Sequence, residues 1–204
     1  MNSGRNTSTL RPKDDEEVAE LHGYQTPEVI LGPFYPADRV APRRGDLRFV
    51  DGGQAVAIGK PILVSVRVVN SRGAGLVGIY VEFWQANSSG RYRHPGDHGT
   101  GALDPAFDGF ASQVTDHSGL LTFKTVKPGP YQTPWGEWRA PHIHFQVTSG
   151  PHRLITQMFF PGEPLNDTDR CLHSCRPPGL LVAKAVDPPP TSMAVVEWVI
   201  VLPS

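Results

Sequence analysis

The 204-residue chain is long enough for one domain with a buried core, and its 19 basic and 20 acidic residues leave a formal net charge of −1. Because no run of like charges stands out, the composition gives no support to a nucleic-acid or membrane-surface partner. The longest apolar stretch, residues 193–202, contains Glu197 and is too short to span a bilayer, and the polar first 21 residues do not resemble a secretory signal, so a cytoplasmic location is expected.

The N-terminal part of the chain divides into a polar arm and an extended segment. Residues 1–24 mix Asn, Ser, Arg, Asp and Glu and are predicted to form an arm that precedes a single folded domain over residues 25–204. Residues 26–36, Thr-Pro-Glu-Val-Ile-Leu-Gly-Pro-Phe-Tyr-Pro, follow as a Pro-rich stretch that predicts extended backbone. Its apolar side chains indicate that this segment packs against the domain and is not a free linker.

The body of the chain alternates short apolar runs with turn residues. In residues 62–69, Val64, Val66 and Val68 share one face, and this period of two predicts a strand. Further strands are predicted at residues 76–85, 120–126, 142–147, 154–160 and 194–202. The 21 glycines and 21 prolines are spread between these runs, and no window of helical periodicity competes. The predicted fold class is therefore all-β, an antiparallel β-sandwich of about seven or eight strands with long loops.

Several polar residues in the predicted loops have simple structural explanations. His94 and His98 are four residues apart, but a Pro-Gly pair between them argues against a helical turn, so solvated loop side chains are preferred over metal ligands. Asp104 and Asp116 lie in turn sequences and are interpreted as turn formers, not as acid–base groups.

Two histidines and two tyrosines are the candidates for chemistry. His142 and His144 lie two apart in the predicted strand 142–147, so both imidazoles project to one face and can reach one point. Neutral imidazole is the commonest metal ligand, although two neighbouring surface histidines would give the same pattern. Tyr92 and Tyr131 each follow a turn, and each taken alone could equally be a core or rim residue whose hydroxyl bonds to backbone.

The two cysteines bracket a histidine in the sequence Cys171-Leu-His173-Ser-Cys175. A metal knuckle is conceivable, but structural zinc usually needs four ligands in two paired clusters. Reduced thiols in a loop are the preferred interpretation, in keeping with the expected location.

Four stretches taken together resemble the intradiol ring-cleavage dioxygenase family, and its protocatechuate 3,4-dioxygenase branch most closely. They are Phe-Trp-Gln-Ala-Asn-Ser-Ser-Gly-Arg-Tyr-Arg-His at 83–94, Leu-Asp-Pro-Ala-Phe at 103–107, Val-Lys-Pro-Gly-Pro-Tyr at 126–131, and Trp-Arg-Ala-Pro-His-Ile-His-Phe at 138–145. The similarity continues through Leu-Ile-Thr-Gln-Met-Phe-Phe-Pro-Gly at 154–162, so it covers about residues 26–165 in order.

The resemblance implies Fe(III) as cofactor, with Tyr92 and His142 as equatorial ligands and Tyr131 and His144 as axial ligands. It implies that all four ligand positions are filled, as in the iron-binding, catalytic type of subunit. Anionic tyrosinate oxygens favour ferric iron, in contrast to the ferrous oxygenases that use two histidines and one carboxylate.

The resemblance also implies the reaction and its substrate contacts. A protocatechuate-like catechol and O2 are the expected substrates, both oxygen atoms enter the ring between the hydroxyl carbons, and a cis,cis-muconate is the product. Tyr131 would make way for the substrate. Arg139 would stabilise negative charge developing on the ring, and this role is preferred over the alternative of a structural ion pair. The remaining substrate-binding residues would be Gly32, Pro33, Trp84, Arg139 and Gln157.

A homo-oligomer, or a hetero-oligomer with a related subunit, is expected from the resemblance, with the Gly32–Pro33 segment available to complete a neighbour's site. Trp135 cannot be assigned as a pocket wall, because the spacing after Tyr131 differs from the family pattern. Residues 166–190 match poorly and leave one edge of the pocket undefined.

Two other interpretations compete with this enzyme. A non-catalytic, transthyretin-like sandwich would explain the turns and strands but not the Trp-Arg-Ala-Pro-His-Ile-His sequence at 138–144. A zinc hydrolase would need a nearby carboxylate base, and none is identified. Colour separates the three, since tyrosinate bound to ferric iron absorbs visible light.

Overall fold

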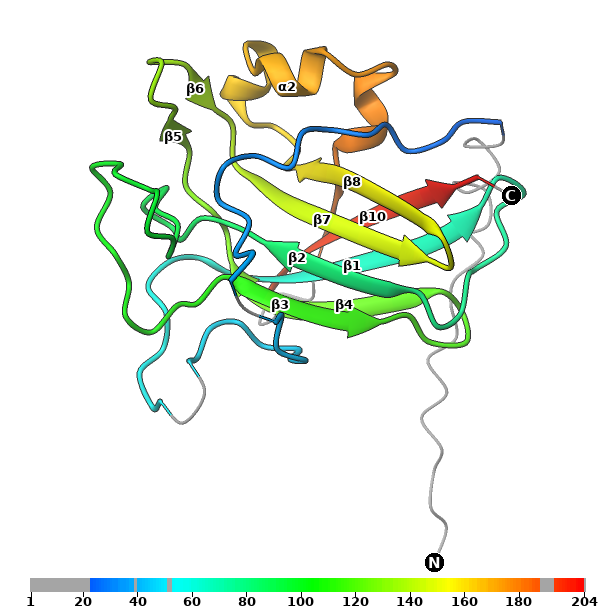
Figure 1. Ribbon diagram of the computed structural model, residues 1–204, viewed down its shortest axis with the longest axis horizontal. Helices are drawn as coiled ribbons and strands as arrows, with labels where there is room; N and C mark the ends of the chain where they lie inside the picture. Colours follow the sequence, from blue (N-terminus) through cyan, green and yellow to red (C-terminus); the bar gives the residue numbers. More distant parts are fainter. Residues whose placement is uncertain (1–22, 39, 51–52, 188–192, 204) are drawn as a thin grey trace, which may run out of the picture.

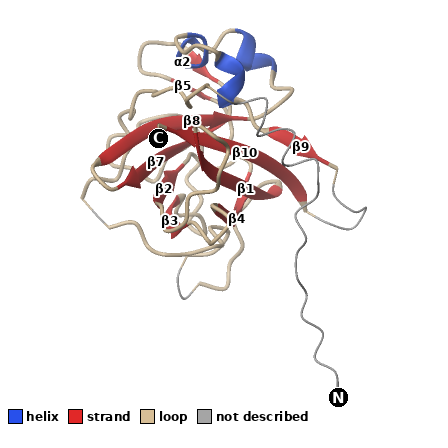
Figure 2. Cartoon of the chain, turned by 90° about the vertical axis from the view of Figure 1, so that its right-hand side faces the viewer, coloured by secondary structure: helices blue, strands red, loops and turns tan. Residues whose placement is uncertain are grey.

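The structure is a computed structural model that describes residues 23–38, 40–50, 53–187 and 193–203. The predicted polar arm, residues 1–24, therefore lies outside the described residues except for Gly23 and Tyr24. Two four-stranded sheets, in the orders β4-β1-β10-β9 and β3-β2-β7-β8, form the two layers of a sandwich, and a small β5-β6 hairpin forms a third sheet (Figure 1). In both views α2 and β5 lie on the same side of the sandwich, beyond β8 (Figure 2).

The strands have the following bounds: β1 Pro61–Asn70, β2 Tyr80–Trp84, β3 Phe110–Val114, β4 Leu120–Val126, β5 Tyr131–Gln132, β6 Trp138–Arg139, β7 His142–Ser149, β8 His152–Phe159, β9 Lys184–Val186 and β10 Ala194–Leu202. The helices are short: the 3-10 helices η1 Pro164–Asp167 and η2 Pro178–Leu181, and the α-helix α2 Arg170–His173. No helix among the described residues is long and apolar enough to cross a membrane.

The core lies between the two sheets and follows from the alternating sequence of the strands. Val64 and Val66 on β1 are fully buried, whereas Ser65 between them is only half-buried. Phe83 on β2 stacks on Phe123 on β4 with 4.0 Å between ring centroids, and both neighbour Phe145 on β7. Because β4 belongs to one sheet and β2 and β7 to the other, this aromatic cluster joins the layers and fixes the position of β7.

The predicted β-sandwich is confirmed, and the seven strands of five or more residues match the expected number. The predicted strands 120–126 and 194–202 have the predicted bounds. One pairing departs from the antiparallel expectation, because β1 runs parallel to β10 over nine residue pairs.

Local differences from the predicted elements have physical reasons. The strand predicted for residues 76–85 begins only at Tyr80, because Gly78 has a φ of +76° and interrupts the extended backbone. The short strand β3 was not predicted, and neither were the helical turns between residues 164 and 181. Those turns occupy much of the segment that the sequence left undefined.

Candidate metal centre

His142 and His144 occupy alternate positions at the start of β7, and their side chains lie on the same face of the sheet. Both side chains are 2% exposed, their Nε2 atoms are 3.1 Å apart, and their ring centroids are 4.8 Å apart. Period-two geometry explains this convergence, since Ile143 between them points into the apolar core. The strand thus presents two ring nitrogens to one point.

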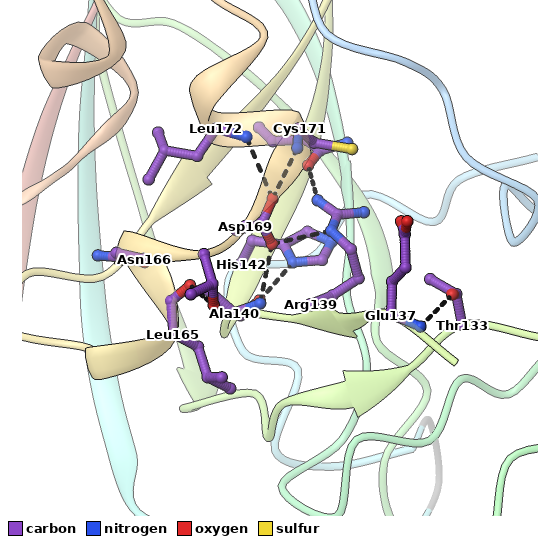
Figure 3. A network of polar contacts seen from close by, with 12 residues as sticks. Thr133, Glu137, Arg139, Ala140, His142, Leu165, Asn166, Asp169, Cys171 and Leu172 are labelled. Atoms are coloured by element: carbon purple, nitrogen blue, oxygen red, sulfur yellow. Dashed lines mark hydrogen bonds and ion pairs between the residues drawn. The ribbon is translucent and has the colours of Figure 1, made fainter. Parts of the chain in front are cut away.

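The tautomer of His142 follows from its hydrogen bond to Ala140. Nδ1 lies 2.7 Å from the Ala140 carbonyl oxygen, which can only accept, so Nδ1 carries the proton and Nε2, on the side of His144, keeps a free lone pair (Figure 3). Burial lowers the pKa of His142 well below 6.5, and the positive charge of Arg139 lowers it further. Burial also lowers the pKa of His144 well below 6.5. Both rings are therefore neutral, the form that binds metals.

The two tyrosine rings complete a closed set with the two imidazoles. Tyr92 and Tyr131 meet edge to face with centroids 5.5 Å apart. The Tyr131 ring is 5.7 Å from the His142 ring, and the Tyr92 ring is 6.2 Å from the His144 ring. Each ring thus neighbours the next, and the structure brings together all four side chains that the resemblance singled out.

Gly90 explains how the loops that carry the two tyrosines come so close. It has a φ of +74°, and a Cβ atom added there would lie 2.2 Å from the Pro130 carbonyl oxygen. Tyr131 directly follows Pro130, while Tyr92 is two residues after Gly90. On the other side, Asp97 accepts a hydrogen bond of 2.7 Å from the Tyr92 backbone N–H and so fixes the loop.

Two buried polar atoms of these four residues lack a hydrogen-bond partner, the Tyr92 hydroxyl and His144 Nδ1. Burial raises the pKa of the Tyr92 phenol well above 10, and the neighbouring Tyr131 phenol raises it further. Burying a hydroxyl without a partner is unfavourable, and a cation would both bind it and favour its phenolate form. Two phenols and two neutral imidazoles whose rings lie next to one another are a donor set that fits a hard, highly charged metal ion.

Among the described residues, no group of three or more His, Cys, Asp or Glu side chains is placed to hold a metal ion. The four-ring set includes only two residues of these types, His142 and His144, so its fit does not depend on such a group. Cys171 and Cys175 are free thiols, and His173 instead bonds through Nε2 to the Asn166 carbonyl oxygen at 2.9 Å.

Arg139 and Gln157 reach the site through strand pairing. Arg139 on β6 is opposite Tyr131 on β5, and Gln157 on β8 is opposite His144 on β7. Arg139 Nη2 donates to Gln157 Oε1 at 2.6 Å, and Gln157 Nε2 donates to the Ile30 carbonyl oxygen at 3.0 Å. The predicted substrate-side pair is therefore bonded together, and it also holds the segment that precedes Gly32.

Gly32 and Trp84 both lie against His144. A Cβ atom added at Gly32 would be 3.2 Å from His144 Cε1, and Gly32 has a φ of +76°. The Trp84 ring stacks on the imidazole at 4.8 Å with 9° between the planes. Pro33 is exposed beside this contact. The Gly32–Pro33 segment thus covers the histidine of its own chain, whereas the sequence left open a role in a neighbour's site.

Phe34 is a contact that the sequence analysis did not single out. Its ring is 4.7 Å from the Tyr92 ring and 6.1 Å from the Tyr131 ring. A cavity of about 490 Å³ borders Phe34 and Tyr131, and its wall includes Trp138. Trp135 does not line this cavity and is 81% exposed, so it is not a pocket wall.

Asp169 is the main residue that sequence reasoning missed. It is fully buried, and its Oδ2 accepts from Arg139 Nε and from the Ala140 backbone N–H, both at 2.9 Å (Figure 3). Its Oδ1 accepts from the backbone N–H groups of Cys171 and Leu172, so Asp169 also caps α2. An Asp before a short helical turn is a capping signal that the sequence does contain. Its contact with Arg139 is not readable from sequence.

Comparisons with known proteins agree with this geometry. The sequence profile of a family described as "Dioxygenase" matches residues 30–204. The chain is 40% identical over 139 residues to the protocatechuate 3,4-dioxygenase beta chain of Burkholderia cepacia, which covers 65% of this chain and 58% of that protein. It is 31% identical over 159 residues to catechol 1,2-dioxygenase of Candida albicans, which covers 71% of this chain and 50% of that protein.

A solved structure of a dioxygenase has a similar fold. The dioxygenase domain of a dioxygenase carbohydrate-binding fusion from Streptomyces sp. SirexAA-E superposes with a TM-score of 0.67 at 28% identity, over 88% of this chain and 98% of that one. The match thus spans 58% and 50% of the two sequence relatives and nearly all of this domain. These three relatives give no support to a non-catalytic, transthyretin-like module.

Proposed function

Because the chain belongs to the intradiol ring-cleavage dioxygenase family, we propose that it opens a catechol-type ring between its two hydroxyl carbons. Both atoms of O2 enter the product, a cis,cis-muconate, and two protons are released. We further propose a protocatechuate-like substrate, which draws on the printed name of the Burkholderia relative.

Fe(III) would be held by Tyr92, Tyr131, His142 and His144. The observation that carries this proposal is the convergence of four buried or half-buried aromatic rings, with the two imidazole Nε2 atoms 3.1 Å apart and the Tyr92 hydroxyl left without a partner. When bound, ferric iron would serve as Lewis acid and template for the catecholate.

The two tyrosines would have different tasks. Tyr92 is 3% exposed and packed between Phe34 and His144, so it stays in place. Tyr131 is half-buried and borders the open cavity, so it has room to move aside when a substrate enters. Its phenolate oxygen would then take the proton of one substrate hydroxyl, which keeps the charge of the site balanced.

Arg139 would stabilise the negative charge of the bound ring. The residue is 6% exposed, and its guanidinium is held at Nε and at Nη2 by two different side chains. A fixed donor in a dry site stabilises developing charge better than a mobile one, because it needs no reorganisation. The stacked Trp84 and the Gly32 backbone would exclude water from the His144 side.

Assembly is part of the proposal. The matched Burkholderia protein is named a beta chain, so self-association or association with a related subunit is proposed here too. The covering segment of this site comes from the same chain, so a second type of chain is not needed to supply it.

Anaerobic titration of the ferric protein tests the proposal. We expect a red-brown protein whose visible band shifts when catechol, protocatechuate or hydroxyquinol binds, followed by uptake of one O2 and release of the matching cis,cis-muconate. The substrate with the highest kcat/KM identifies the ring substituent. A colourless iron-loaded protein, or a product cleaved outside the two hydroxyl carbons, would overturn the assignment.

A further inference from the structure

We propose that Asp169 is a positioning residue of this site, which fixes the direction of the Arg139 guanidinium and couples the short helix α2 to the reaction. The inference rests on the proposed function and deepens it, because it adds a residue from the segment 166–190. Asp169 itself does not line the cavity next to Tyr131.

The two carboxylate oxygens of Asp169 serve two different structures. Oδ1 accepts from the backbone N–H groups of Cys171 and Leu172 and caps α2. A helix cap needs no more than this. Oδ2 turns the other way and accepts from Arg139 Nε and from the Ala140 N–H (Figure 3). One side chain thus connects the start of α2 to the residues that lead into β7.

The ion pair between Asp169 and Arg139 is shielded from water. The two side chains are 0% and 7% exposed, and the Nε–Oδ2 distance is 2.9 Å. A buried carboxylate is unfavourable unless it is paired and hydrogen-bonded, and Asp169 meets both conditions through its four contacts. Water therefore has little access to either charged group and cannot readily take the place of a partner that is removed.

The guanidinium is held at two points that together prevent its rotation. Asp169 binds Nε, and Gln157 binds Nη2 at 2.6 Å, while Nη1 takes part in neither bond. Gln157 is oriented in turn, because its Nε2 donates to the Ile30 carbonyl oxygen. These hydrogen bonds form a series that runs from Asp169 at the start of α2 to Arg139, then to Gln157, and then to Ile30. The series joins α2, β6, β8 and the Gly32–Pro33 segment that covers His144.

The same Asp169 oxygen also acts on the metal-binding strand. It holds the N–H of Ala140, whose carbonyl oxygen accepts the Nδ1 proton of His142. Loss of the Asp169 carboxylate would therefore loosen the peptide that orients His142 as well as the guanidinium. The first effect should change the visible spectrum, and the second should change kcat.

Asp169→Asn is the primary test. The amide oxygen can still accept the hydrogen bonds that cap α2. Toward Arg139, however, the amide carries no negative charge and can turn an N–H donor to the guanidinium. In the iron-loaded protein we expect kcat to fall on the order of 10²-fold with a much smaller change in KM, since a misplacement of about 1 Å can cost that much. The tyrosinate-to-iron colour should remain, but its visible band should shift because the peptide that orients His142 is loosened. Asp169→Ser, which also caps a helix but cannot reach Arg139, should behave alike and serves if the amide variant does not fold.

Asp104→Asn is the matched control. Asp104 is also a buried carboxylate that accepts two backbone N–H bonds, from Ile58 and Ala106, but it has no arginine partner in those contacts. We expect it to lower the melting temperature and leave kcat unchanged.

A double-mutant cycle separates positioning from structure. In an Arg139→Leu background, Asp169→Asn should lower kcat little further, and the melting temperature of the metal-free protein should fall less than the two single effects added together. An Asp169→Asn kcat within about 3-fold of wild type, or undiminished losses in the Arg139→Leu background, overturns the positioning role. A wild-type protein without ring cleavage overturns the proposed function and the positioning role with it, so the two failures are distinguishable.

Discussion

His144 on β7 is paired directly across the sheet with Gln157 on β8. Because opposed residues project to the same face, this register places a proposed metal ligand beside the side chain that binds Arg139. A slip of one residue in β8 would turn Gln157 to the other face. The candidate site therefore depends on the same strand pairing that builds the sandwich.

Arg139→Leu should separate iron binding from turnover. The variant keeps all four proposed ligands, so we expect a coloured protein whose kcat falls on the order of 10²-fold, as for the loss of a charge-stabilising donor. It also leaves Asp169 buried without its cation, so the free energy of unfolding should fall by about 3–5 kcal/mol. Oxygen uptake and thermal unfolding measure the two effects. Near-normal turnover would refute the role of Arg139.

Tyr92→Phe should change stability and metal binding in opposite directions. The Tyr92 hydroxyl is buried without a partner, and such a group costs about 1–3 kcal/mol, so its removal should stabilise the metal-free protein or leave it unchanged. Iron affinity should nevertheless fall by at least about 10-fold, a loss typical even of outer-shell changes. Metal titration followed by visible absorbance and denaturant unfolding test both halves.

Tyr35→Phe is the control for that variant. The Tyr35 hydroxyl donates to Glu82 Oε2 at 3.3 Å and is no proposed ligand. Its removal should cost about 0.5–1.5 kcal/mol of unfolding free energy and leave the iron colour intact. If Tyr92→Phe destabilises the metal-free protein like this control and still binds iron normally, Tyr92 is an ordinary core residue.

The fold was predictable because the strands carry their own signal. The alternation of Val64, Val66 and Val68 identifies β1, and the apolar run of β10, broken only by Glu197, identifies the last strand with its bounds. The parallel pairing of these two strands was not predictable, since it joins segments more than 120 residues apart in sequence by packing alone. The sequence also predicted a strand from residue 76, but the positive φ of Gly78 delays its start to Tyr80.

The site was predictable only in part, for a related reason. His142, His144, Tyr92 and Tyr131 lie in short motifs that the resemblance identifies, and the structure brings their rings together. Asp169 lies in a segment without periodicity, and its role depends on Arg139, which is 30 residues away. Contacts of this kind leave no local pattern in a sequence.

Gly32→Ala tests the covering segment against a matched control. Gly32 and Gly78 have the same φ of +76°, so a side chain at either position costs about 1–2 kcal/mol in backbone energy. An added Cβ meets His144 Cε1 at 3.2 Å at Gly32 but nothing within 4 Å at Gly78. We expect similar losses of stability from the two variants and a raised KM from Gly32→Ala alone. Equal KM values in both variants would show that the segment does not contact the substrate site.

Gly90→Ala should disrupt the approach of the two tyrosine loops. The new Cβ would lie 2.2 Å from the Pro130 carbonyl oxygen, and no real contact is that short, so the loops must separate. The free energy of unfolding should fall by more than the roughly 1–2 kcal/mol that positive φ alone costs in Gly78→Ala. Because Tyr92 and Tyr131 would no longer face one point, iron bound per chain and the visible band should both decrease after reconstitution. A variant that is destabilised yet takes up a full equivalent of iron with unchanged colour would show that the convergence of the two phenols is not what binds the metal.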